Sequence, residues 1–261
     1  MSLPPTAAWP TMHRFADATA LVDGAAAWIA AELARAIEQR GSAGLVLAGG
    51  STPRPVYALL ARADHTPAID WARVRIYFGD ERCVPPDAEA SNYRMAREVL
   101  LDHVAVPAAQ VFRIDGERPP ADAARRYHGV LDAAPSLDVI MLGMGEDGHV
   151  ASWFPGAVAF GPGALAAATT SPIAPRDRIT ITRRTMAIAR ATIVLVSGAA
   201  KARRLAEVHA EIRAAKPVLP AARVTCAAGA PHWFIDDEAA SALPRDVVEP
   251  AAVTPSDEES S

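Results

Sequence analysis

The chain has 261 residues, of which 51% are hydrophobic and 21% are charged, and its formal net charge is -4. This is the composition of a globular protein with ample core material, and the slightly acidic balance gives no indication of a nucleic-acid partner. No apolar stretch is long enough to span a bilayer, and the first ten residues lack the basic start and apolar core of a signal peptide. Cys83 and Cys226 are far apart and in no metal-like spacing, so we expect reduced thiols in a cytoplasmic protein.

Helical and strand-like segments alternate along the first half of the chain. Apolar residues recur at helical spacing over residues 19–40, and Gly41 ends that helix. The later segments predict, in order, a strand at 45–47, a helix at 53–63, a strand at 74–78, a helix at 91–101 capped by Ser91, a short strand at 111–114 and a helix at 121–131. Arg125 and Arg126 mark the solvated face of the last helix.

The second half continues the alternation. The predicted segments are, in order, strands at 137–142, 178–182 and 193–196, a helix at 199–214 and a last strand at 232–236. Residues 157–175 are rich in Ala, Gly and Pro and predict no regular element. Strands that alternate with helices indicate an α/β fold: a Rossmann-like, doubly wound, mostly parallel sheet with helices on both faces. We expect one domain over residues 1–243 and a disordered acidic tail over residues 244–261.

Residues 137–152, LDVIMLGMGEDGHVAS, combine a buried strand with a glycine-rich polar loop. The three glycines of the loop match the dinucleotide fingerprint G-x-G-x-x-G, but a genuine fingerprint opens into a helix and is followed about 20 residues later by an acidic residue. Here Pro155 interrupts any helix, and no acidic residue occurs between Asp147 and Asp177. The loop is therefore a weak candidate for nicotinamide binding, whereas its Asp147 and His149 are candidates for chemistry.

A second glycine-rich loop follows the strand predicted at 45–47. It reads Gly49-Gly50-Ser51-Thr52-Pro53, where the glycines allow a tight turn, Ser51 and Thr52 can cap the next helix, and Pro53 suits its first turn. Free N–H groups, hydroxyls and the positive end of the helix dipole can together bind an anion at such a place. A capped helix after a tight turn explains the same residues equally well, and this loop lacks the lysine of a P-loop.

Charged side chains follow two further strands. Asp80-Glu81-Arg82 come directly after the strand predicted at 74–78, where they form either a solvated turn or part of a site. Lys201 lies in the first turn of a predicted helix, where a cation opposes the helix dipole unless an anion is bound nearby. Because ligands of parallel α/β sheets bind beyond the carboxyl ends of the strands, we expect these clusters and the two glycine-rich loops to meet in one crevice.

Taken together, these clusters resemble the 6-phosphogluconolactonases, a family that is related to glucosamine-6-phosphate deaminase. The matching motifs follow the family's order between residues 45 and 201. They are Gly49-Gly50-Ser51-Thr52-Pro53; Asp80-Glu81-Arg82 with Ser91-Asn92-Tyr93-Arg94-Met95-Ala96; Gly143-Met144-Gly145-Glu146-Asp147-Gly148-His149 with Ala151-Ser152 and Phe154-Pro155; Arg178-Ile179-Thr180; and Gly198 with Lys201. The chain departs from the family at Val150 and Trp153, where Thr and Leu are usual, and at Arg183, Arg184 and Ala187, where Leu, Pro and Asn are more frequent.

The resemblance implies a Rossmann-like fold and hydrolysis of 6-phospho-D-glucono-1,5-lactone to 6-phosphogluconate in the pentose phosphate pathway, without a metal or cofactor. Water must attack the lactone carbonyl, and a neutral imidazole is a suitable base near pH 7. We expect His149 to be this base, with Asp147 or Asp80 as its orienting carboxylate and Arg82 or loop N–H groups as donors to the oxyanion. The residues expected to bind the substrate, chiefly through its phosphate, are Gly50, Ser51, Thr52, Arg82, Arg178 and Lys201.

Two alternatives remain. Glucosamine-6-phosphate deaminases resemble this chain in both glycine-rich loops, but their histidine loop usually continues as Ala-Phe-Asn-Glu-Pro. Here residues 151–155 read Ala-Ser-Trp-Phe-Pro, without a carboxylate, which favours the lactonase. A non-catalytic sugar-phosphate sensor is disfavoured by the presence of both Asp147 and His149. The predicted partner is thus a small phosphorylated sugar lactone, with no nucleic acid or membrane, and the protein is expected to be a monomer or weak homo-oligomer.

Overall fold

The computed structural model describes residues 10–62, 69–156, 160–227, 230–244 and 247. Nearly all of the expected acidic tail, and the last residue of the helix predicted at 53–63, lie outside these ranges. Within the ranges, every helix is too short or too polar to cross a membrane.

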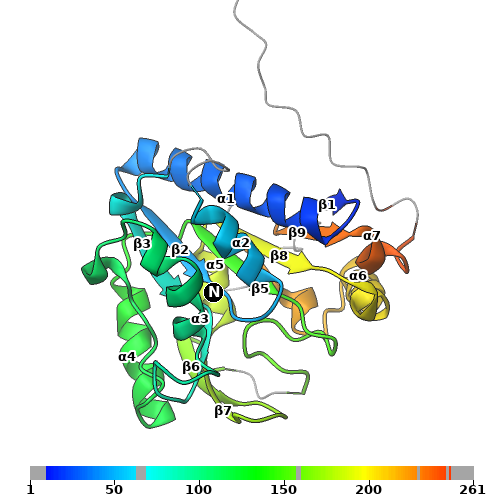
Figure 1. The fold of residues 1–261 in the computed structure, drawn as a ribbon. Coiled ribbons are helices and arrows are strands. Elements are labelled where there is room, and N and C mark those ends of the chain that lie inside the picture. The colour runs from blue at the N-terminus through cyan, green and yellow to red at the C-terminus, as the bar shows by residue number, and fades with distance from the viewer. Residues whose placement is uncertain (1–9, 63–68, 157–159, 228–229, 245–246, 248–261) are drawn as a thin grey trace, which may run out of the picture.

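A six-stranded parallel sheet forms the centre of the molecule (Figure 1). In spatial order its strands are β1 (Thr11–Phe15), β9 (His232–Asp236), β8 (Ala191–Val196), β5 (Val139–Gly143), β2 (Ala43–Leu47) and β3 (Val74–Phe78). The inner strands are nearly continuous apolar runs, because both faces of a parallel sheet are covered. The predicted α/β fold with a mostly parallel sheet is confirmed.

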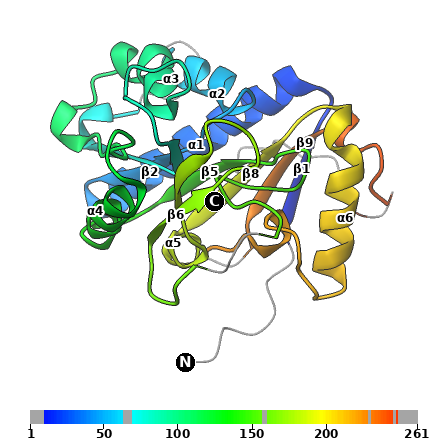
Figure 2. The same ribbon diagram turned by 90° about the horizontal axis from the view of Figure 1, so that it is seen from below.

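The order of the strands decides which face of the sheet each helix covers. They are α1 (Ala18–Arg40), α2 (Pro53–Leu60), α3 (Asn92–Val99), α4 (Pro120–Asp132), α5 (Arg183–Ile188), α6 (Ala202–Arg213) and α7 (Asp237–Ala240). Crossovers between parallel strands are almost always right-handed, so connections that run in opposite directions along a sheet cover opposite faces. In Figure 2, α1 and α2 lie above the sheet, whereas α4, α5 and α6 lie below or beside it.

The chain reverses its direction along the sheet between β2 and β5, which are neighbours in register. From β2 the chain passes through α2 outward to β3, while from β5 it passes in the other direction to β8. In open α/β sheets, ligands bind at such a reversal, beyond the carboxyl ends of the strands. The two glycine-rich loops predicted from the sequence are the loops that leave β2 and β5 at this point.

A second, three-stranded antiparallel sheet was not predicted. It consists of β4 (Asp80–Arg82), β7 (Asp177–Ile181) and β6 (Ala166–Thr170), and α4 packs against β6 and β7. Only the segment of β7 had been predicted as a strand. A local pattern does not reveal the other two, since β4 has no apolar residue and β6 is Ala-Thr-rich; both become strands because β7 pairs with them.

Several helix ends agree with the prediction and some short elements do not. Gly41 ends α1 in the left-handed conformation and Ser91 caps α3, as predicted, whereas the cap of α1 by Asp17, which accepts a hydrogen bond from the Ala20 N–H, had not been predicted. The segment 111–114 is not a strand but makes one bridge, between Val111 and Ile76. The helix predicted at 199–214 begins with a 3₁₀ turn. The edge strand β1 was missed because it is partly exposed and lacks an apolar run, and α5 and α7 were missed because they are short.

Candidate active site

The loop after β2 is fixed at its start and open at its end. The Tyr57 hydroxyl of α2 accepts a hydrogen bond from the Ala48 N–H and donates one to the Ala48 carbonyl, each at 2.7 Å. Gly50 has a φ of +104°, which residues with a side chain rarely adopt. Ser51 is exposed, and the Thr52 side chain makes no capping hydrogen bond, contrary to prediction. The first N–H groups of α2 are therefore not capped by Thr52, which suits the binding of an external anion.

The loop after β5 is a tight turn whose glycines make room for His149. The Gly148 N–H donates to the Gly145 carbonyl at 3.0 Å, and the Gly145 N–H donates to the His149 carbonyl at 2.9 Å. Gly148 has a φ of +85°, a conformation that favours glycine. A Cβ atom at Gly145 would lie 2.1 Å from Nδ1 of His149, so the ring occupies the space of the missing side chain.

Asp147 holds the ring of His149. Its Oδ1 lies 2.6 Å from the ring Nδ1 and also accepts the His149 backbone N–H at 3.1 Å. Burial alone raises the pKa of the Asp147 carboxyl, but these hydrogen bonds and the ring charge outweigh burial, so the pKa lies below its ordinary value. With Nδ1 donating to a carboxylate, Nε2 is the nitrogen that can accept a proton. The His149 side chain is 35% exposed and its ring lies 5.0 Å from the ring of Phe154.

Asp80 has a different environment from Asp147. Its side chain is buried, Oδ2 accepts a hydrogen bond from the Ser152 hydroxyl at 2.6 Å, and Oδ1 accepts one from the Asn92 amide at 3.1 Å. Asp80 therefore joins the segment after His149 to the start of α3. Of the two carboxylates expected to orient His149, the structure brings Asp147 into contact with the ring, while the partners of Asp80 are Ser152 and Asn92.

Glu81 was not expected to be buried, but only 2% of it is exposed. Its carboxylate accepts hydrogen bonds from the Ser91 hydroxyl and from the backbone N–H groups of Asn92 and Tyr93, so it covers the start of α3. Burial raises the pKa of Glu81 although these bonds oppose the rise. Asn92 in turn fills the space beside Gly49, where a Cβ atom would lie 2.2 Å from the Asn92 side-chain oxygen. These contacts connect β4, α3 and the loop after β2.

Arg82 and Arg178 lie opposite each other in the pairing of β4 with β7. The Arg82 guanidinium donates to the Ala90 carbonyl at 2.6 Å. Arg178 is buried and donates to the Pro175 carbonyl at 2.8 Å. Burial first, and then the charge of Arg82, lower the pKa of Arg178. Arg178 thus anchors the hairpin between β6 and β7, a role that the sequence did not suggest.

Lys201 approaches the histidine loop from the end of β8. Its Nζ lies 3.9 Å from the carboxylate of Glu146, and Lys201 is 20% exposed while Glu146 is 71% exposed. Asp236 of β9 accepts hydrogen bonds from the Ser197 hydroxyl and the Gly198 N–H, and so fixes the turn that leads to Lys201. The structure therefore brings the exits of β5 and β8 together, as expected.

Residues 16–233 match the family model described as glucosamine-6-phosphate isomerases/6-phosphogluconolactonase. The chain belongs to this family.

Relatives in the family agree with the match. The 6-phosphogluconolactonase of Mycobacterium leprae is 35% identical over 249 residues, covering 88% of this chain and 97% of the relative, and that of Aggregatibacter actinomycetemcomitans is 34% identical over 200 residues, covering 76% and 86%. The crystal structure of 6-phosphogluconolactonase from Thermotoga maritima has a TM-score of 0.76 at 30% identity, covering 88% of this chain and 100% of that one. A monomeric glucosamine-6-phosphate deaminase, at 21% identity and a TM-score of 0.75, shares the fold.

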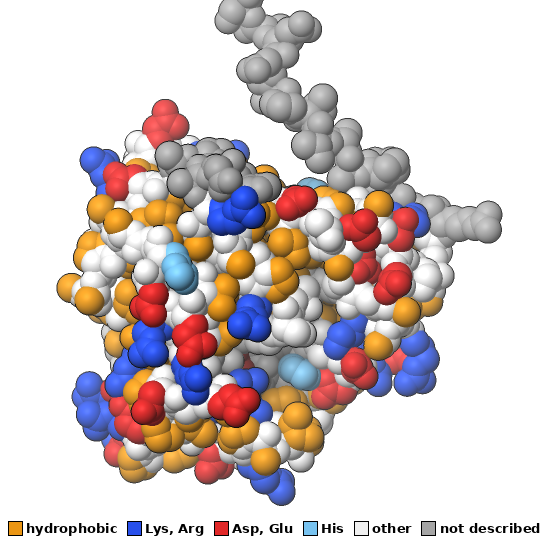
Figure 3. All heavy atoms as spheres, in the orientation of Figure 1, with side chains coloured by type: hydrophobic (Ala, Val, Ile, Leu, Met, Phe, Trp, Pro, Cys, Tyr) orange, Lys and Arg blue, Asp and Glu red, His pale blue; other side chains and the backbone are white. Residues whose placement is uncertain are grey.

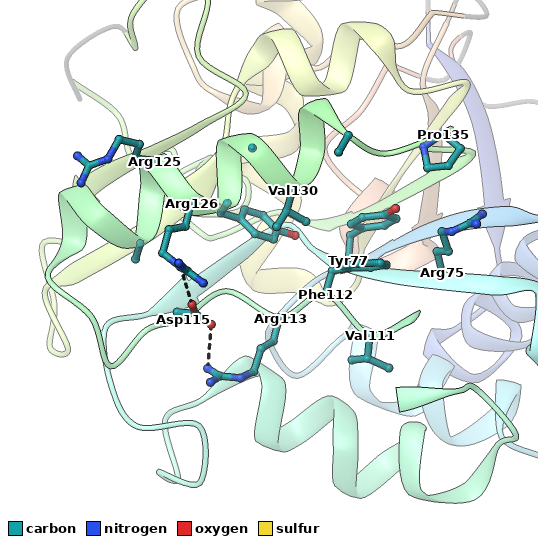
Figure 4. Close-up of a pocket in the computed structure, with 14 residues that line it drawn as sticks. Arg75, Tyr77, Val111, Phe112, Arg113, Asp115, Arg125, Arg126, Val130 and Pro135 are labelled. Carbon is teal, nitrogen blue, oxygen red and sulfur yellow. Dashed lines mark hydrogen bonds and ion pairs between the residues drawn. The ribbon is translucent and has the colours of Figure 1, made fainter. Parts of the chain in front are cut away.

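Two cavities lie on different parts of the molecule. One, of about 370 Å³, is lined by Asp147 and by residues of the histidine loop and the β6–β7 hairpin. The other, of about 920 Å³, lies between β3, α4 and residues 111–115 (Figure 4), and it includes none of the predicted site residues. Its Arg113 and Arg126 both face Asp115 and are paired with it. The smaller cavity is therefore the one that belongs to the candidate active site.

Proposed function

We propose that this protein hydrolyses 6-phospho-D-glucono-1,5-lactone to 6-phospho-D-gluconate, the reaction of the oxidative pentose phosphate pathway for which its relatives are named. The observation that carries the proposal is the 2.6 Å contact between Asp147 and Nδ1 of His149 in the loop after β5. It leaves Nε2 of a partly exposed imidazole available to a water molecule. The proposed chemistry requires neither a metal nor a cofactor.

In this mechanism, Nε2 of His149 takes a proton from water as the water oxygen attacks the lactone carbonyl carbon. Asp147 holds the ring and stabilises the imidazolium that forms. The carbonyl oxygen becomes an oxyanion, to which Arg82 or loop N–H groups donate. Collapse of the tetrahedral intermediate breaks the ring C–O bond, and His149 returns the proton to the leaving hydroxyl. The product is an open-chain carboxylic acid, which ionises at neutral pH.

The phosphate of the substrate is assigned to the loop after β2 and to Lys201, which follows β8. Gly50, Ser51 and Thr52 offer backbone N–H groups and hydroxyls at the start of α2, and Lys201 adds a positive charge from the end of β8. One donor of the Arg178 guanidinium is used by the Pro175 carbonyl of the hairpin. Arg178 therefore contributes to phosphate binding through its positive charge and its remaining donors. Binding energy from the phosphate positions the distant lactone carbonyl.

The proposal extends to the organisation of the chain. Residues 1–243 form one catalytic domain, and the protein acts in the cytoplasm as a monomer or weak homo-oligomer without nucleic acid. In support, acidic and basic side chains are interspersed over the face shown in Figure 3. Association with nucleic acid requires a concentrated basic surface instead.

The test is the loss of freshly made 6-phosphogluconolactone with purified protein. We expect a rate far above the spontaneous rate, and His149→Ala should reduce it strongly without unfolding the protein. A rate equal to the spontaneous rate rejects the proposal. Ammonia release from glucosamine 6-phosphate is measured in parallel, and such release would favour the deaminase instead, although residues 151–155 lack the carboxylate typical of deaminases.

A further inference from the structure

The smaller cavity extends from the proposed catalytic pair to the tip of the hairpin between β6 and β7. One wall comes from the histidine loop and the other from the hairpin, and together they comprise Asp147, Phe154, Pro155, Gly156, Thr170, Ser171, Pro172 and Arg176. Asp147 contacts His149 directly, and the Phe154 ring lies 5.0 Å from the same ring in a tilted orientation. A molecule in this cavity is thus close to the proposed site of hydrolysis.

Hydrogen bonds hold the hairpin tip in a defined shape. The Ser171 N–H donates to the Arg176 carbonyl at 2.7 Å, and the Ser171 hydroxyl accepts the Ile173 N–H at 3.2 Å. The buried Arg178 guanidinium donates to the Pro175 carbonyl at 2.8 Å. The backbone that carries Arg176 is therefore anchored on both sides, which lowers the entropic cost of presenting its side chain to a ligand.

Arg176 supplies the positive charge of this cavity, since the other lining residues are neutral or, like Asp147, acidic. Among the described residues, its guanidinium makes no ion pair, whereas some other exposed arginines are paired, such as Arg125 with Asp122. Asp147, in the same cavity, is already engaged by His149. The donors of the Arg176 guanidinium are therefore available to an incoming anion.

We infer that Arg176 recognises the phosphate of the lactone as it enters the active site, and thereby makes the enzyme select the phosphorylated over the unphosphorylated sugar lactone. This inference rests on the proposed function. A phosphate monoester carries close to two negative charges near neutral pH, and a guanidinium matches its geometry better than an ammonium does. Arg176 acts at the rim of the site, in addition to Ser51, Thr52 and Lys201, and takes no part in the proton transfers at His149.

The experiment compares Arg176→Ala and Arg176→Lys with the wild type on two substrates, 6-phosphoglucono-1,5-lactone and D-glucono-1,5-lactone. Arg125→Ala is the matched control, because it removes one exposed arginine from α4, away from this cavity. We expect Arg176→Ala to lower kcat/KM for the phosphorylated lactone about tenfold, through KM, as the loss of a charge-assisted hydrogen bond does. The rate with the unphosphorylated lactone should not change, Arg176→Lys should keep part of the selectivity, and Arg125→Ala should match the wild type.

One further measurement helps to separate the possible outcomes. Calorimetric titration with 6-phosphogluconate, which requires no turnover, should show the same weakening for Arg176→Ala. The inference is overturned, while the proposed function stands, if folded Arg176→Ala loses kcat/KM equally on both lactones or keeps the wild-type ratio of kcat/KM between them. If the wild type does not accelerate loss of the phosphorylated lactone at all, the proposed function and the inference both fail.

Discussion

Gly145 gives the sharpest test of the proposed catalytic pair. In Gly145→Ala, the new Cβ atom would lie 2.1 Å from His149 Nδ1 and 2.8 Å from Asp147 Oδ1. Because Cβ atoms essentially never approach other heavy atoms within 3.0 Å, the ring must move by at least 3.0 minus 2.1, or 0.9 Å. A shift of that size is enough to stretch the 2.6 Å contact between Asp147 and His149 to the limit of a hydrogen bond.

We expect Gly145→Ala to lower kcat about 100-fold, since a misplacement of about 1 Å in a catalytic group has effects of this order. The backbone of Gly145 has no positive φ, so the variant should still fold. Gly143→Ala is the matched control from the same segment, because its Cβ would meet no atom nearer than Pro53 Cδ at 4.0 Å. Steady-state kinetics of both variants measure the change in kcat, and thermal unfolding shows whether both variants are folded. If folded Gly145→Ala turns over like the wild type, the ring geometry does not control catalysis.

Three further predictions follow from named contacts. Asp147→Asn should reduce kcat by about 100-fold or more, with little effect on KM, because the ring loses the charge that orients it; equal losses from Asp80→Asn would contradict this assignment. Ser152→Ala should lower the free energy of unfolding by about 1 to 3 kcal/mol in urea denaturation, because a buried Asp80 oxygen loses its donor. The third concerns His13, whose Nε2 lies 3.0 Å from Nδ1 of His232. Burial, and then the neighbouring His232, lower the pKa of His13 to about 4. As pH falls from 6.5 toward 4, His13 therefore becomes protonated in the unfolded chain but stays neutral in the folded protein. This contribution to the free energy of unfolding is fully present above pH 6.5, and it should decline by about 1 to 2 kcal/mol between pH 6.5 and 4, after allowance for solvent screening. Urea denaturation at several pH values should show that His13→Asn removes this part of the pH dependence.

The long elements were predictable because their signals are local. The apolar periodicity of residues 19–40 predicted α1, and Gly41 directly after them predicted its end. The apolar runs of β3 and β9 coincide with their predicted bounds for the same reason. β4 and β6 carry no such pattern, because their strand conformation depends on hydrogen bonds to β7, whose residues lie far away in the chain.

By itself, the sequence determined the types of chemical group and the loops that present them: the glycine-rich turns, Asp147 and His149 two residues apart, and the order of strands and helices. The tertiary structure decided which of these groups touch. It placed Asp147 rather than Asp80 against the imidazole, buried Glu81 under α3, and left the guanidinium of Arg176, in the cavity that Asp147 lines, without an ion pair to any described residue. The physical reason is that burial and hydrogen-bond pairing depend on partners from distant segments, about which the residue types near any one position carry no information.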